Sequence, residues 1–147
     1  MAYDPISVRV VEAMPIAAVR RQVTAKTLMS EAMKAPIWTL TQQRGIKTTG
    51  QMVLIYHDRG NEMLINRPGG VAVDIGVQVE APFQGDAALQ CVMTPAGRVA
   101  WARHHGHYEL LPTIHGDIRA WCISQGLEIA GINWEHYWHW LEEPPGF

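Results

Sequence analysis

An internal repeat constrains the fold of this chain more than any other feature of the sequence. Three landmarks recur with one spacing of 81 positions: Gly45, Gly50 and Tyr56 return as Gly126, Gly131 and Tyr137. Upstream, Pro15 and Val19 return 80 positions later as Pro95 and Val99. A repeat of this length predicts two copies of one supersecondary unit, neither of which can bury its hydrophobic face alone. We therefore expect the copies to pack together, with a ligand cleft at the seam between them.

The repeat fits within a single domain spanning residues 1–147. Repeat one covers about 1–83, repeat two about 88–141, and residues 142–147 form a short C-terminal tail. Apolar residues make up 48% of the chain and charged residues 18%, which is enough apolar material for one core.

Hydrophobic periodicity predicts the elements of each copy. Strands are expected at 6–11, 17–23, 51–57 and 70–80, and again at 89–93, 98–104 and 132–141. An apolar stripe from Met29 to Leu40 predicts a helical stretch, which Pro36 either kinks or divides, and a second helix is expected over 107–125. The resulting order of strand, strand, helix and strand in each copy predicts an α+β fold with a largely antiparallel sheet.

Charge and apolar patterning exclude several classes of function. A net charge of −2 without a basic block argues against direct binding of nucleic acid. No apolar run approaches the ~20 residues of a membrane span, and the N-terminus shows no signal peptide, so no membrane partner is expected. Cys91 and Cys122 are isolated in apolar surroundings, which favours a reduced, cytoplasmic protein.

Four motifs then resemble one family in their order and spacing. Asp74–Val79 reads D-x-x-V-x-V, and Val99–Tyr108 reads V-A-x-x-x-H-x-G-x-Y. Trp121–Leu127 reads W-x-x-x-x-G-L, and Glu135 with Tyr137 forms E-x-Y. Together they resemble the GyrI-like small-molecule-binding domain, which is the effector-binding domain of AraC-type and multidrug-responsive transcription regulators.

This resemblance implies two strand-helix-strand-strand units around a pseudo-twofold axis, with a cleft for hydrophobic, often cationic, aromatic compounds. The central glutamate of that cleft corresponds to Glu135, with Tyr137 beside it. The sequence departs from the family pattern at His107 and after residue 137, where Trp138 and Trp140 stand in place of an N-D-P segment. The DNA-binding domain of the regulators is absent, so direct control of transcription is not expected of this chain alone.

Glu135 also stands out from the residues themselves. A carboxylate within the aromatic strand 134–140 is costly if buried, and a cationic ligand would supply its partner. Alternation along a strand places Glu135, Tyr137 and His139 on one face. The repeat spacing adds Leu54 and Tyr56 from copy one, which predicts a pocket floor of Leu54, Tyr56, Glu135 and Tyr137. The alternative is an exposed edge strand with a solvated charge.

Aromatic and histidine residues near the second helix offer weaker signals. Trp101 is either a stacking wall for an aromatic ligand or an ordinary core residue, and Tyr108 either contacts ligand or packs in the core. His104, His105 and His107 suggest a metal site, but adjacent histidines on an extended segment point opposite ways. No carboxylate or cysteine stands at a familiar ligand spacing, so no metal site is predicted. An axial role for His115 in haem binding is a further alternative, but no cofactor is predicted.

These observations predict a stand-alone protein that binds small apolar, planar and in some cases cationic compounds, for sensing or sequestration. Glu135 would neutralise ligand charge while Trp and Tyr rings stack on the ligand. The resemblance also implies an enzymatic alternative, a hydrolase of cyclopropane-bearing alkylating compounds. Glu135 would then be catalytic and would need a raised pKa to activate water. A gyrase-inhibitor-like interaction with another protein is a third reading, and a homodimer or a separate DNA-binding partner stays open.

Overall fold

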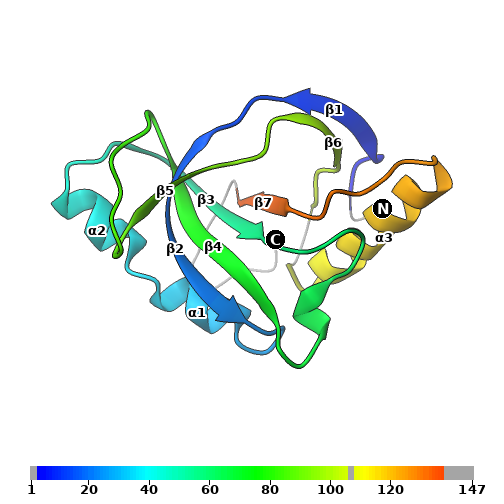
Figure 1. Ribbon diagram of the computed structural model, residues 1–147, viewed down its shortest axis with the longest axis horizontal. Helices are drawn as coiled ribbons and strands as arrows, with labels where there is room; N and C mark the ends of the chain where they lie inside the picture. The colour runs from blue at the N-terminus through cyan, green and yellow to red at the C-terminus, as the bar shows by residue number, and fades with distance from the viewer. Residues whose placement is uncertain (1–2, 106–107, 138–147) are drawn as a thin grey trace.

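The computed structural model describes residues 3–105 and 108–137 and has a mixed α+β architecture (Figure 1). Its main sheet is antiparallel and has the strand order β5-β2-β4-β3-β7, and β1 pairs with β6 in a separate two-stranded sheet. The strands are β1 (Ser7–Val11), β2 (Pro15–Val23), β3 (Thr48–Tyr56), β4 (Val71–Val79), β5 (Gln90–Met93), β6 (Gly97–Trp101) and β7 (Asn133–Tyr137). The predicted fold class is confirmed. Within the described residues, β6 is shorter than predicted; positions 138–141 of the last predicted strand lie outside them.

The first helical stretch consists of two helices. α1 (Leu28–Lys34) ends before Pro36, and α2 (Ile37–Gln43) begins directly after it. Ala35 has an extended ψ of 127°, as expected for a residue that precedes proline. Of the two predicted alternatives, the structure therefore shows a new helix rather than a kink.

The second helical region is shorter than the predicted 107–125. A 3-10 turn, η2 (Tyr108–Leu110), leads into α3 (Leu111–Ser124), which has Pro112 in its first turn, where proline suits a helix. A further 3-10 turn, η1 (Leu64–Asn66), lies between β3 and β4. No helix in the described part of the chain is long and apolar enough to cross a membrane.

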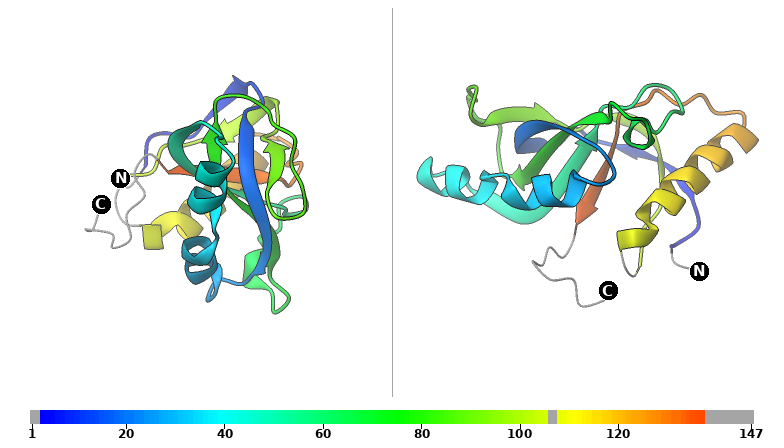
Figure 2. Two further views of the ribbon diagram at one scale, coloured as in Figure 1. Left: turned by 90° about the vertical axis from the view of Figure 1, so that its left-hand side faces the viewer. Right: turned by 90° about the horizontal axis from the view of Figure 1, so that it is seen from below.

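The main core lies between the five-stranded sheet and the first two helices. Leu54, Ile75 and Val77 of the sheet pack with Ala32 of α1 and Ile37 of α2, and all are at most 3% exposed. Ile16, Val53 and Ile55 form a smaller cluster on the other face, with Trp134 packed against it. Figure 2 shows α1 and α2 together along one side of the sheet, whereas α3 lies at the other end of the molecule, beyond β7.

The pairing of β3 with β7 determines which side chains meet near α3. Leu54 lies directly opposite Glu135, Met52 opposite Tyr137 and Tyr56 opposite Asn133. Because side chains alternate between the faces of a strand, Tyr56, Glu135 and Tyr137 project from the same face of the sheet.

Candidate functional site

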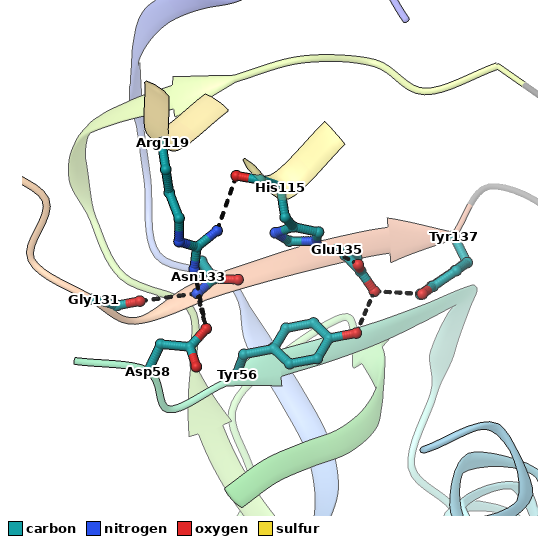
Figure 3. Close-up of polar contacts among 8 residues, drawn as sticks. All are labelled: Tyr56, Asp58, His115, Arg119, Gly131, Asn133, Glu135 and Tyr137. Carbon is teal, nitrogen blue, oxygen red and sulfur yellow. Dashed lines mark hydrogen bonds and ion pairs between the residues drawn. The ribbon is translucent and has the colours of Figure 1, made fainter. Parts of the chain in front are cut away.

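A buried carboxylate with three polar partners lies between β3, β7 and α3 (Figure 3). Oε1 of Glu135 accepts hydrogen bonds from the hydroxyl of Tyr56, at 2.8 Å, and from the hydroxyl of Tyr137. Oε2 lies 2.6 Å from Nε2 of His115. The side chains of Glu135 and His115 are only 10% and 15% exposed. We call these four residues the Glu135 cluster.

The local structure explains how the cluster forms. Tyr137 follows Glu135 by two positions on β7, so both side chains point the same way. Tyr56 is the diagonal neighbour of Glu135 across the β3–β7 ladder, a distance that a long aromatic side chain can span. His115 reaches Glu135 from the second turn of α3, and its ring meets the Tyr56 ring edge-on at a centroid distance of 5.7 Å.

Opposing effects set the protonation of the cluster. Burial raises the pKa of Glu135, but the contacts from His115, Tyr137 and Tyr56 outweigh it, so the pKa of this carboxyl lies below its ordinary value. Burial and the charge of Glu135 hold the pKa values of Tyr56 and Tyr137 well above those of ordinary phenols. At neutral pH the cluster therefore holds an ionised carboxylate and two protonated phenols.

A second polar group, which we call the Asp58 cluster, lies one helical turn further along α3. Oδ2 of Asp58 accepts hydrogen bonds from Nη2 of Arg119, at 3.1 Å, and from Nδ2 of Asn133, at 2.8 Å. Oδ1 of Asp58 accepts from the backbone N–H of Leu64 at 3.0 Å. The side chains of Asp58 and Arg119 are 6% and 11% exposed, so this is a buried ion pair.

The Asp58 cluster requires a glycine at position 131. Gly131 has a φ of +128°, which favours glycine, and a Cβ there would lie 2.5 Å from the backbone oxygen of Asp58. Its carbonyl accepts a hydrogen bond from Asn133 at 2.9 Å. One of the landmark glycines of the repeat thus permits the segment before β7 to approach the end of β3.

A cleft of about 1070 Å³ opens beside the Glu135 cluster. It is lined by β1, β6, α3, β7 and the segment 127–132. Val8, Trp101, Ile118 and Trp134 are among its apolar lining residues, and His115 and Glu135 are among its polar ones. The cleft is therefore largely apolar and has a buried, ionised carboxylate in its wall.

The structure places the predicted site residues differently with respect to this cleft. Glu135, Tyr137 and Trp101 line it. Leu54 has no exposed surface and belongs to the main core, while Tyr56 is 7% exposed and reaches the site through its hydroxyl. Tyr108 begins the 3-10 turn before α3, and its side chain, like His139, lies outside what the structure describes.

Trp101 is already covered on one face of its ring. The guanidinium carbon of Arg9 lies 3.6 Å from the ring centroid, and that of Arg103 lies 5.8 Å from it. Both positions are within the range of a cation–π interaction. The sequence left Trp101 as either a stacking wall or a core residue and did not indicate its arginine partners.

The histidines near α3 have separate roles. His105 pairs with Asp4 at 2.8 Å, and no group of three or more potential metal ligands occurs among residues 3–105 and 108–137. His115 is the site residue that sequence reasoning missed as a partner of Glu135. Its spacing of four residues from Arg119 places both side chains on the same face of one helix but does not indicate a contact with Glu135.

An α+β fold with a large apolar cleft and a few convergent polar groups defines the class of small-molecule-binding domains. The family model that describes the GyrI-like small molecule binding domain matches residues 4–142, and the chain belongs to this family. A search of curated proteins found no match.

Proposed function

We propose that this domain binds small, apolar, planar compounds in the cleft beside α3, for sensing or sequestration. The observation that carries the proposal is the cleft itself, with its apolar lining and the Glu135 cluster in its wall. A volume of about 1070 Å³ lies just above the roughly 300–1,000 Å³ of common small-molecule pockets, so the cleft can hold a drug-sized compound. Trp101 and Trp134 supply rings on which a planar ligand can stack.

The strand registers support the proposal that the chain contains two related repeats, whereas the cleft is lined mainly by residues 98–137 of the second one. In the β3–β7 ladder, Met52 lies opposite Tyr137 and Tyr56 lies opposite Asn133. Replacing each member of the first pair by the residue 81 positions away gives the second pair, and the same replacement turns the pair Leu54–Glu135 into itself. With a spacing of 80, Ala17 of β2 corresponds to Gly97 of β6, and Cys91 of β5 corresponds to Val11 of β1. Ala17 and Cys91 lie opposite each other, and so do Gly97 and Val11. These registers are those expected of a duplicated unit with a pseudo-twofold axis between Leu54 and Glu135.

The charge of Glu135 bears on the kind of ligand. An ionised carboxylate in an apolar wall attracts cationic aromatic compounds, yet here it already has a resident partner in His115. The same surroundings give no support to a hydrolytic role for Glu135. A general base needs a pKa near the working pH, whereas the contacts from His115 and the two phenols lower the pKa of Glu135.

Binding can be tested with a pair of fluorescent benzothiazoles. Thioflavin T is a permanent cation, and the analogue that lacks its ring N-methyl group is neutral but nearly identical in shape. We expect both compounds to quench tryptophan fluorescence and to bind with a stoichiometry of one. The substitution Ala100→Phe on β6 narrows the cleft and should weaken binding of both compounds at least ~10-fold, whereas Ala87→Phe in an exposed loop outside the cleft should not. Equal binding by these two variants would place the ligand elsewhere.

A further inference from the structure

We propose that His115 is the specificity-determining residue of the cleft. It serves as the resident counter-ion of Glu135, and a cationic ligand binds beside Glu135 by replacing it, so that the proton of His115 is released to solvent. This inference rests on the proposed function, because it concerns ligands of the same cleft.

The partners of Glu135 differ in what they do to its charge. Tyr56 and Tyr137 donate neutral O–H groups to Oε1, so they stabilise the carboxylate and leave its negative charge in place. His115, at 2.6 Å from Oε2, is the partner that can carry a positive charge. A protonated imidazole at this position occupies the place that a ligand cation would take.

His115 can leave without undocking the helix that carries it. Within residues 3–105 and 108–137, its imidazole makes no hydrogen bond other than the one to Glu135. α3 is held separately by the buried pair of Arg119 with Asp58, one turn further along. The His115 side chain also borders the cleft, so a change of rotamer can move the ring toward open space.

Charged groups on every neighbouring element bear on the proton of His115. β7 presents Glu135 and Tyr137, and β3 presents Tyr56. On α3 itself, Nη1 of Arg119 donates to the backbone carbonyl of His115 at 3.1 Å, and Asp58 balances the charge of this arginine. The further charged or titratable groups along the same cleft are Arg98, Arg103, His104, His105, Cys122, Glu128 and His136. Glu135 is therefore the anion in direct contact with the His115 ring.

Displacement of the His115 ring from Glu135 by a ligand cation should release a proton to solvent. Once a ligand cation takes Glu135 as its partner, a protonated His115 loses its counter-ion and faces a second positive charge. The neutral imidazole is then favoured, and a proton passes to solvent. By linkage, release of a proton on binding means that binding of cations strengthens as the pH rises, whereas binding of neutral ligands does not.

Calorimetry with the two benzothiazoles tests this coupling. Each compound is titrated into the intact chain at about pH 6 in two buffers that differ in enthalpy of ionisation. We expect thioflavin T to release up to one proton per molecule bound and its neutral analogue to release none. We also expect the affinity for thioflavin T to rise severalfold with pH, with the affinity for the neutral analogue nearly constant.

Two variants assign the proton to His115. In His115→Gln the amide nitrogen can still donate to Glu135 but carries no charge, so thioflavin T should bind without proton release and with little dependence on pH. His57→Gln is the matched control, since His57 also pairs with a buried carboxylate, Asp74 at 2.7 Å, but lies outside the residues that line the cleft. This control should keep the proton release of the unmodified chain.

The outcomes separate this inference from the proposed function. Binding of both compounds with no proton release overturns the role of His115 and leaves the proposed function intact. Unchanged proton release in His115→Gln overturns it as well. If neither compound binds, both the role of His115 and the proposed function are overturned. If His115→Gln does not fold, the two-buffer measurement on the unmodified chain still decides whether cations and protons exchange.

Discussion

The helices of this domain are attached to its sheet in two different ways. α1 and α2 pack through apolar contacts, with Ala32 and Ile37 buried against the main core. α3 makes two polar contacts with the sheet, from His115 to Glu135 and from Arg119 to Asp58, and both arise from one face of the helix. The part of the sheet under α1 and α2, which we call the covered half, is therefore closely packed. The part near α3, which we call the cleft half, contacts its helix through the Arg119–Asp58 ion pair and the His115–Glu135 contact, although α3 also buries Ile114 and Cys122.

The difference shows how a fold can keep a cleft open. Apolar packing is non-directional and tends to fill space, since a void forfeits dispersion contacts on every side. A buried ion pair is directional and is stable only in good geometry, so it fixes the position of a helix without filling the surrounding volume. Polar attachment of α3 is thus compatible with a cavity of about 1070 Å³ beside it.

Truncation of apolar side chains should show the largest contrast between the halves. Leu54 is completely buried in the covered half, so Leu54→Ala should lower the free energy of unfolding by about 3–5 kcal/mol. Ile118→Ala on the cleft side of α3 should cost less than about 1.5 kcal/mol, because this side chain is only partly buried and already borders open space. Urea denaturation measures both values. Equal losses would mean that α3 packs as closely as α1 and α2.

The next effect concerns the ion pair that holds α3. Arg119→Met removes the cation and leaves Asp58 with Asn133 and the backbone N–H of Leu64 as its remaining donors. We expect a loss of about 2–3 kcal/mol in unfolding free energy. The double variant Arg119→Met with Asp58→Asn should recover part of this loss, since no uncompensated charge remains.

Arg44 and Asp86 provide the control for this measurement. They form an ion pair of similar length, 2.8 Å, near the covered half, but their side chains are 30% and 57% exposed. Arg44→Met should therefore cost much less than Arg119→Met, because solvent screens an exposed pair. If both arginine substitutions had the same small effect, α3 would not depend on its buried ion pair.

The sequence predicted the covered half better than the half that carries the cleft. Apolar alternation located the strands, and Pro36 marked the division between α1 and α2, because these signals are local in the chain. Glycines such as Gly45, with a φ of +66°, marked ends of elements for the same reason. The start of α3 was predicted several residues too early, since a 3-10 turn shares the composition of a helix.

The candidate site was predicted in part. Glu135 and Tyr137 could be paired from strand alternation alone, and the repeat spacing pointed to Leu54 and Tyr56 as their neighbours. The partner His115 could not be found this way, because its contact depends on how α3 docks across the sheet. No local pattern encodes that distance, and a single histidine on a helix has no distinctive spacing.

The stability of the Glu135→Gln variant should depend on pH differently from that of the unmodified chain. Because contacts in the folded state lower the pKa of Glu135, its stabilising contribution is complete above the unfolded-state pKa of about 4.3 and is lost as the pH falls below it. Glu135→Gln should therefore be less stable than the unmodified chain at neutral pH, and the difference should shrink below about pH 4. Thermal unfolding across this pH range measures the effect. A difference that stays constant down to acid pH would contradict an ionised, stabilised Glu135.

The smallest expected effect is a difference in reactivity between one cysteine of the covered half, Cys91, and one on α3, Cys122. Cys91 on β5 is partly exposed, whereas Cys122 on α3 is buried and borders the cleft. Burial raises the pKa of the Cys122 thiol despite the nearby Arg119, so less of it is present as the reactive thiolate. Iodoacetamide near pH 8, followed by peptide mass spectrometry, should modify Cys91 several-fold faster. A ligand in the cleft should slow Cys122 further and leave Cys91 unchanged. Comparable rates without ligand would mean that α3 moves away from the sheet often enough to expose its buried face, in which case its ion pairs would not hold it in place.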